Sequence, residues 1–268
     1  MPAADAARPG DDNGDLALIR EAARVGGEIA MRYFKRNPET WLKGGRSPVS
    51  EADYAVDHYL REHLTAARPD YGWLSEETTD SPARLSARRT FVVDPIDGTR
   101  AFLEGDSTWC VSIAVVEQGQ PLVGVLDCAA RGETFEAALG RGSFRNAAPI
   151  RVGLHSETPL VSGPKALLDR ASGGWPDNFR RGPYFPSLAY RIAVVASGEL
   201  DATFVKPNAH DWDIAAADLI LREAGGRLVD IHGNGLHYAG ADPRHGALVA
   251  GSGPLVDRLA AMIASIRD

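Results

Sequence analysis

Apolar residues recur at helical spacing in five stretches of the chain. Over residues 16–35 they fall on one side of the predicted helix. These residues are Leu16, Ile19, Ala23, Ala30 and Phe34. Asp15 is placed to cap this helix and Asn37-Pro38 to end it. The same spacing predicts helices over residues 51–66, 187–196 and 255–266, and one across residues 216–224 that stops at Gly225-Gly226.

Short apolar runs rich in β-branched residues predict strands between these helices. They lie near residues 72–75 and 90–94, and at 110–117, 121–127, 133–138, 202–205, 227–231 and 247–250. Gln118-Gly119-Gln120 predicts a hairpin between two of them. Pro95 has no N–H to donate, so the strand before it should end at Asp94. Residues 139–186 are rich in glycine, proline and arginine, and their pattern favours no element.

Composition narrows the class of protein. The chain has 268 residues, 44% hydrophobic and 24% charged, which is enough for a large core in one or two domains. Its formal net charge of −7 argues against binding to DNA or RNA, which needs a basic surface. The two cysteines, Cys110 and Cys128, lie in apolar runs and predict reduced core residues, not a disulfide or a metal site.

The N-terminal segment is predicted to lie outside the folded unit. Residues 1–14 contain proline, glycine and aspartate but no apolar segment of a secretory signal, so we expect a disordered tail. Residues 15–268 then form one unit. No run reaches the length of a membrane-spanning helix. We therefore expect a cytoplasmic protein without a membrane partner.

The segment Asp94-Pro95-Ile96-Asp97-Gly98-Thr99 carries the strongest chemical signal. It places two carboxylates three residues apart after a buried strand, with the Ile96 carbonyl between them. Carboxylate and carbonyl oxygens are ligands that magnesium prefers. Gly98 allows a close backbone approach, and a helical turn beginning at Thr99 has free N–H groups for a phosphate. The alternative is turn chemistry alone, since Asp-Pro and Asp-Gly are ordinary turn dipeptides.

Three more acidic clusters accompany this segment. Asp213 stands at the start of a predicted helix, where either it or Asp211 is the cap. Glu76-Glu77 follows a short strand, and alternation would direct one glutamate to a site and the other to solvent. Ser50-Glu51-Ala52-Asp53 fits a capping box. Capping or a solvated loop explains each of these clusters when it is taken singly.

Together the segments resemble the inositol monophosphatase superfamily of magnesium-dependent, often lithium-sensitive phosphomonoesterases, which includes the bisphosphate nucleotidases. The resemblance covers about residues 15–265. Its motifs are Ser50-Glu51-Ala52-Asp53, Ser75-Glu76-Glu77, Asp94-Pro95-Ile96-Asp97-Gly98-Thr99 and Trp212-Asp213-Ile214-Ala215-Ala216. Ser75 stands where the family usually has glycine. The resemblance implies an α/β fold, an α-β-α-β-α layered sandwich, with a metal-site half in residues 15–140 and a substrate-specificity half in residues 141–268. Members are commonly dimers, so a homodimer is compatible with it.

The resemblance also implies roles for the matching residues. Two or three Mg²⁺ ions per site would be held by Glu76, Asp94, the carbonyl of Ile96, Asp97 and Asp213. The catalytic residues would be Asp53, Glu76 and Thr99, with Thr99 and Asp53 orienting the attacking water. The substrate, a small-molecule phosphate ester, would contact Gly98, Thr99 and Asp213. Arg191 and Lys206 are further candidate substrate contacts because of their positive charge, and not because of the resemblance.

The substrate specificity stays open at this point. Residues 187–191 and 206–211 form the candidate specificity region, and Lys206 stands where inositol-preferring members carry a glutamate. The substrate is then an inositol or sugar monophosphate, or 3′-phosphoadenosine 5′-phosphate, for whose second phosphate Lys206 and Arg191 are suited. Histidinol phosphate is a further alternative, although Lys206 disfavours its ammonium group. Lys206 and Arg191 are otherwise solvated residues, and His210 is a polar lining group or a structural histidine.

A non-catalytic regulatory protein of the same fold is the alternative from another functional class. Its metal site would be structural only. The presence of both Thr99 and Asp53 argues against it, because a scaffold has no need for that pair.

Overall fold

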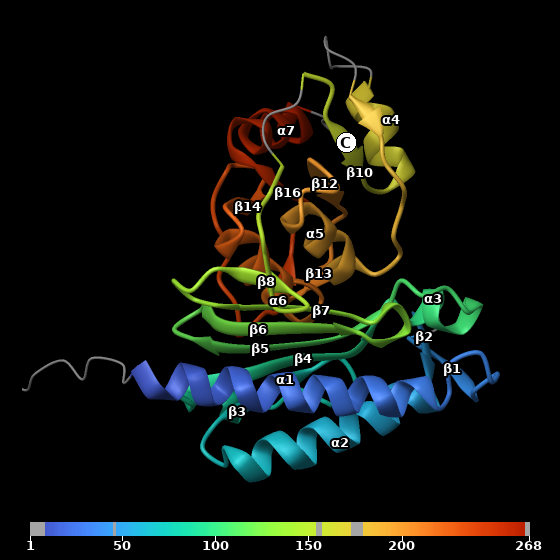
Figure 1. Ribbon diagram of the computed structural model, residues 1–268, viewed down its shortest axis with the longest axis vertical. Coiled ribbons are helices and arrows are strands. Elements are labelled where there is room, and N and C mark those ends of the chain that lie inside the picture. The colour runs from blue at the N-terminus through green and yellow to red at the C-terminus, as the bar shows by residue number, and fades with distance from the viewer. Residues whose placement is uncertain (1–8, 45–46, 154–156, 173–178, 266–268) are drawn as a thin grey trace, which may run out of the picture.

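The computed structural model describes residues 9–44, 47–153, 157–172 and 179–265. Its helices and sheets stack in alternating layers, as Figure 1 shows. Helices α1 (Pro9–Met31) and α2 (Glu51–Ala67) cover one face of a seven-stranded sheet. Helices α5 (Leu188–Ala196) and α6 (Asp211–Glu223) separate it from a five-stranded sheet, beyond which lie α4 (Lys165–Ser172) and α7 (Gly253–Ser265). This is the α-β-α-β-α sandwich that the resemblance implies.

The seven-stranded sheet carries the acidic segment on its second strand. Its order is β3 (Gly72–Ser75), β4 (Arg89–Asp97), β5 (Cys110–Glu117), β6 (Gln120–Cys128), β7 (Glu133–Ala138), β8 (Ser143–Arg145) and β9 (Ala148–Ile150). Only the β3–β4 pair of this sheet is parallel. The prediction that the strand before Pro95 ends at Asp94 is wrong, since β4 continues to Asp97. Its register shifts between Asp94 and Asp97, so Pro95 lies where the ladder is interrupted and no N–H is required.

The five-stranded sheet has the order β11 (Arg180–Arg181), β10 (Leu160–Ser162), β12 (Ala202–Val205), β16 (Leu248–Ser252) and β14 (Gly226–Asp230). Two short antiparallel pairs are β1 (Thr40–Lys43) with β2 (Ser47–Ser50), and β13 (Ala209–His210) with β15 (Arg244–His245). The remaining elements are α3 (Thr99–Glu104) and the 3₁₀ turns Pro82–Ser86 and Ala129–Arg131. Every predicted strand has a counterpart. Residues 139–186 also contain elements that the sequence pattern did not predict: β8, β9, β10, α4 and β11.

The first helix differs from its prediction. Helix α1 begins at Pro9 and ends at Met31, so Asp15 lies inside the helix and is not its cap. Asp15 is buried and accepts hydrogen bonds from Arg68, Tyr71 and Arg89 at 2.9, 2.8 and 2.7 Å. Its carboxylate is a countercharge for buried arginine. Of the tail expected over residues 1–14, residues 9–14 are helical and residues 1–8 lie outside the described residues.

Strand β5 shows how the layers pack, because it is buried on both faces. Val111, Ile113 and Val115 belong to the apolar cluster beneath α1 and α2. Cys110 and Ala114 belong to the cluster that includes α5 and α6. Both cysteines of the chain are free and buried, as predicted. This packing brings the end of β4 against the N-terminal ends of α5 and α6.

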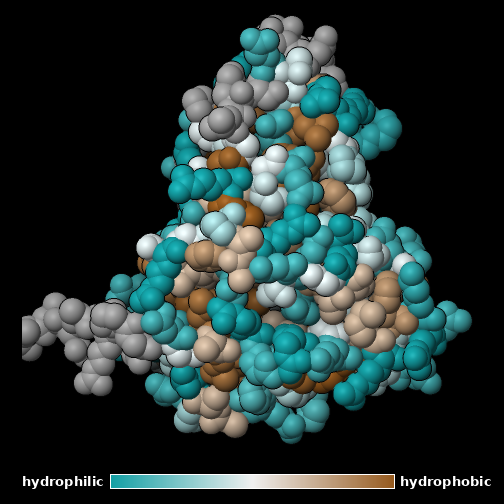
Figure 2. Space-filling view, in the orientation of Figure 1, coloured by the Kyte–Doolittle hydropathy of each residue, from teal (hydrophilic) through white to brown (hydrophobic). Residues whose placement is uncertain are grey.

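The surface is mixed in character. On the face shown in Figure 2, hydrophilic residues cover most of the area and apolar residues are scattered among them. Within the described part of the chain, no helix combines the length and apolar character that a membrane crossing requires.

Candidate metal centre and active site

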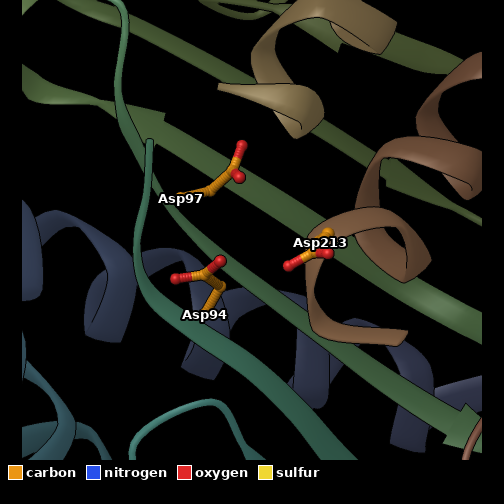
Figure 3. Close-up of side chains that lie close together, drawn as sticks. All are labelled: Asp94, Asp97 and Asp213. Atoms are coloured by element: carbon orange, nitrogen blue, oxygen red, sulfur yellow. The ribbon is translucent and has the colours of Figure 1, made fainter. Parts of the chain in front are cut away.

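Three aspartates meet where β4 ends and α6 begins. Asp94 and Asp97 come from β4, and Asp213 comes from the first turn of α6. Each offers a carboxylate oxygen, and these oxygens lie within 4.8 Å of one another. Figure 3 shows the three side chains gathered between the strand end and the helix start. The sandwich therefore joins acids that are far apart in sequence.

The turn after β4 has a conformation that requires glycine. The Asp94 carboxylate accepts a hydrogen bond from the Ile96 N–H at 3.0 Å, which fixes the start of the turn. Gly98 has φ of +93°, and a Cβ there would lie 3.0 Å from the Ser187 Cβ and 3.2 Å from the Thr108 carbonyl oxygen. Helix α3 begins directly afterwards at Thr99. The backbone at Gly98 therefore tolerates no larger residue.

Asp97 is held by the N-terminal end of α5. Its Oδ2 accepts the Ser187 hydroxyl and, at 2.7 Å, the Ala189 N–H. Ser187 is also the N-cap of α5, and its oxygen accepts the Tyr190 N–H at 3.0 Å. One oxygen of Asp97 is thus committed to the helix, which leaves Oδ1 for another ligand.

Thr99 and Asp53 form a hydrogen-bonded pair beside the three aspartates. Asp53 lies in the capping box of α2, where its Oδ2 accepts the Ser50 N–H at 2.8 Å and the Ser50 hydroxyl at 2.6 Å. The Thr99 hydroxyl lies 3.1 Å from Asp53 Oδ1 and 3.1 Å from the Ile96 carbonyl oxygen. It has one hydrogen and donates to one of them at a time. Asp53 is therefore both a cap and a partner of Thr99.

The two adjacent glutamates differ in their surroundings. Glu76 lines the cavity next to the aspartates and its side chain is 26% exposed. The prediction that the other glutamate points to solvent is wrong, because the Glu77 side chain is only 2% exposed. Its Oε1 lies 2.8 Å from the ammonium of Lys43, which also donates to the Glu76 carbonyl oxygen at 2.8 Å. Lys43 comes from β1, whose exposed residues gave no signal of a role at this site.

Burial and mutual repulsion raise the pKa values of the acids in this cluster. Burial, and then the charges of Glu76 and Asp97, hold the pKa of Asp94 well above its usual range. The pKa of Asp213 is raised in the same way, by burial and then by Asp97. Burial raises the pKa of Glu76 to about 7, although Lys43 opposes this shift. Buried carboxylates that raise one another's pKa values fit a hard divalent cation such as Mg²⁺.

A cavity of about 490 Å³ opens over the acids. Its lining includes the predicted residues Glu76, Asp94, Asp97, Gly98, Thr99, Arg191, Lys206 and Asp213. Asp53 lies behind Thr99, and Ile96 is buried in the turn. Asn208, from the candidate specificity region, lines it as well, as do residues that the sequence did not single out, namely Arg100, Glu104 and Tyr184.

Arg191 is not the solvated residue that was the alternative prediction, since only 3% of it is exposed. Its guanidinium donates to Thr203 Oγ1 at 2.9 Å and to the Phe185 carbonyl oxygen at 2.7 Å. Burial lowers its pKa. Arg191 therefore supports the cavity wall from within the protein.

Neither acid at the start of α6 is its N-cap, which is His210. The Asp213 carboxylate accepts the His210 N–H at 2.8 Å. The imidazole of His210 stacks on Trp212, with ring centroids 4.5 Å apart. Asp211 instead contacts His245 at 2.6 Å and accepts the Ala239 N–H at 2.7 Å. Asp211 thus fixes a neighbouring loop, and Asp213 alone reaches the cluster.

Comparisons with known proteins agree with this geometry. The inositol monophosphatase family matches residues 15–267. The chain is 35% identical over 260 residues to a histidinol-phosphatase of Mycobacterium tuberculosis, covering 91% of this chain and 96% of that protein. It is 34% identical over 236 residues to inositol monophosphatase 2 of Solanum lycopersicum, covering 82% and 88%. The crystal structure of the extragenic suppressor protein suhB from Bartonella henselae superimposes with a TM-score of 0.83 at 27% identity, covering 95% of this chain and all of that one.

Proposed function

Because the chain belongs to the inositol monophosphatase family, we propose that it is a magnesium-dependent phosphatase for a small-molecule phosphate monoester. Inositol or sugar phosphates and 3′-phosphoadenosine 5′-phosphate are the substrates we favour. One observation carries the proposal. The carboxylate oxygens of Asp94, Asp97 and Asp213 lie within 4.8 Å of one another, beside a cavity of about 490 Å³. That volume is typical of small-molecule sites.

The donor set fits two or three Mg²⁺ ions, held by Glu76, Asp94, the Ile96 carbonyl, Asp97 and Asp213. Bound there, magnesium would lower the pKa of water and neutralise charge on the leaving oxygen. The protein's own task is then to place these oxygens and the substrate correctly. The Ser187 hydroxyl orients the Asp97 carboxylate, and the Ile96 N–H orients the Asp94 carboxylate.

Thr99 and Asp53 are placed to handle the proton of the attacking water. When the Thr99 hydroxyl donates to Asp53 Oδ1, its oxygen lone pairs are free to accept a hydrogen from water. Burial raises the pKa of Asp53, which makes its carboxylate a better proton acceptor. The Ser50 bonds hold the other oxygen of Asp53, so the acceptor stays oriented. No serine or cysteine nucleophile is needed.

The leaving group would occupy the outer part of the cavity. The phosphate would lie at the acids, near the backbone N–H groups of Gly98 and Thr99. Lys206 and Arg100 line the remaining wall and contribute positive charge. This charge favours an additional phosphate in the leaving group, and the N–H groups of the two side chains can also donate to the hydroxyls of a polyol.

Histidinol phosphate is the second candidate. The observation in its favour is the 35% identity to a relative named histidinol-phosphatase. Lys206 in the cavity lining opposes it, because an ammonium-bearing leaving group would be repelled.

Phosphate release by the purified protein tests these candidates. The panel is inositol 1-phosphate, 3′-phosphoadenosine 5′-phosphate, histidinol phosphate and fructose 1,6-bisphosphate, with magnesium, with chelator, and with lithium added to magnesium. We expect magnesium-dependent release from one of the first two, inhibited by lithium. Fastest release from histidinol phosphate would favour the second candidate. No release from any ester would favour a non-catalytic, regulatory role.

A further inference from the structure

Tyr184 is an exposed aromatic residue in the lining of the cavity. Its side chain lines the same cavity as the acids, yet the residue is 57% exposed. The Arg191 guanidinium carbon lies over its ring, 5.0 Å from the ring centroid. One face of the ring therefore rests on a buried cation, while much of the ring remains open.

The segment that carries Tyr184 is fixed to the protein on both sides. The Gly182 N–H donates to the Val161 carbonyl oxygen at 2.9 Å. The Ser162 hydroxyl donates to the Pro183 carbonyl oxygen at 2.6 Å. After Tyr184, the Phe185 carbonyl oxygen accepts the Arg191 guanidinium at 2.7 Å. The backbone is thus held before and after the tyrosine, and the ring is presented without a large ordering cost.

Arg191 is itself held in place. Its Nε donates to Thr203 Oγ1 at 2.9 Å, and its exposed fraction is 3%. The Phe185 ring packs edge-on against Tyr190, with centroids 5.3 Å apart. The support beneath the Tyr184 ring is therefore part of the folded core.

We propose that Tyr184 is a specificity-determining residue whose open face stacks on a planar ring of the leaving group. This inference rests on the proposed function, because the phosphate at the acids is what places the leaving group in the outer cavity. Two aromatic rings in offset-stacked or edge-on contact stabilise each other beyond what their buried area alone contributes. The preferred leaving group is accordingly an alcohol that carries an aromatic or heteroaromatic ring. Of the candidate substrates, 3′-phosphoadenosine 5′-phosphate and histidinol phosphate meet this condition, and inositol phosphate does not.

Two model esters isolate this contribution. Benzyl phosphate and cyclohexylmethyl phosphate have the same charge and primary alcohol leaving groups, and differ mainly in the planarity of the ring. The cyclohexyl ring is the more hydrophobic, so apolar burial alone would favour it. A preference for the benzyl ester therefore reports stacking. We expect the wild-type protein to favour it about two- to tenfold in kcat/KM, through KM.

Three variants test the assignment. Tyr184→Leu should bring the ratio to one or below, while Tyr184→Phe should keep the wild-type ratio. Tyr54→Leu is the matched control, since Tyr54 is a half-exposed tyrosine on α2 outside this cavity. An equal rate for both esters in the wild type, or an unchanged ratio in Tyr184→Leu, would overturn the proposal.

Failure of the proposed function gives a different result. In that case neither ester is hydrolysed, with or without magnesium. Calorimetric titration of the wild-type protein and Tyr184→Leu with benzylphosphonate and cyclohexylmethylphosphonate, in magnesium, then decides the role of Tyr184 without turnover. A tighter benzylphosphonate complex that depends on Tyr184 supports the inference. Equal affinities, or no measurable binding of either phosphonate, overturn it.

Discussion

Replacing Asp94 with asparagine keeps the size of the side chain and removes one charge from the cluster. Asp94 is 2% exposed, and the charges that raise its pKa belong to other acids. Two unit charges at the outer limit of 4.8 Å for these carboxylate oxygens repel by about 3 kcal/mol at an effective dielectric constant of 20. Proton uptake relieves part of this repulsion. We therefore expect metal-free Asp94→Asn to be more stable than the wild type at pH 7, by about 1–3 kcal/mol.

Magnesium should reverse this order. A ligand that binds only the folded state stabilises it by about 2.7 kcal/mol at 100 times its dissociation constant. The wild-type protein should gain such stability, and Asp94→Asn should gain much less. Its phosphatase activity should fall by about a thousandfold, or roughly 4 kcal/mol of transition-state stabilisation.

Urea denaturation with chelator and with saturating magnesium measures both effects, and phosphate release measures the activity. Asp257→Asn is the matched control, because Asp257 is an exposed residue of α7 that pairs with Arg227 at the surface. It should leave stability and activity nearly unchanged. Normal turnover by Asp94→Asn in saturating magnesium, or a metal-free variant less stable than the wild type, would refute the reasoning.

Three further predictions follow from neighbouring residues. Thr99→Ala should fold normally and lose most of its kcat, whereas Thr99→Ser should keep much of it; equal kcat values for the two variants would exclude a role for the hydroxyl. Lys43→Met removes the ammonium that lies 2.8 Å from the buried Glu77 carboxylate. Allowing for the partial exposure of Lys43, we expect the free energy of unfolding to fall by about 1–3 kcal/mol. An unchanged melting temperature in thermal denaturation would contradict this. The pKa of Glu76 is raised from 4.5 to about 7. Between about pH 4.5 and pH 7 the folded state therefore binds more protons than the unfolded state. The free energy of unfolding of the metal-free protein should then fall as the pH rises through this range. Denaturation curves across that range should show the fall, and Glu76→Gln should reduce it.

The resemblance of the motifs to a known family predicted the layered fold and which acids would meet. Periodicity alone predicted only a mixture of helices and strands. The Asp94–Thr99 segment has the pattern of a turn after a buried strand, and the helical pattern after Asp213 placed that acid at a helix start. Both signals are local, and the resemblance supplied the long-range pairing. The bounds of β4 were mispredicted because a register shift lets a strand continue past proline.

Residues whose role depends on distant partners were harder to predict. Lys43 lies in an exposed strand, and only the folded chain shows that it reaches Glu77. Asp15 has the sequence position of a cap, but its buried contact with Arg89 decides its place inside α1. Arg191 looked like a surface residue of a helix, yet its partners Thr203 and Phe185 hold it in the core. Local periodicity carries no information about such tertiary contacts.

The position of Asp213 in the chain has a consequence for biosynthesis. It is the last of the clustered acids to be translated, and β14, β16 and α7 follow it. A nascent chain that has just formed the strands from β3 to β7 already contains Asp94 and Asp97 but lacks the third carboxylate. Until α6 emerges from the ribosome and packs on the sheet, the cluster lacks the carboxylate of Asp213. Binding of a cation by all three carboxylates, as proposed, would therefore require the synthesis and docking of α6.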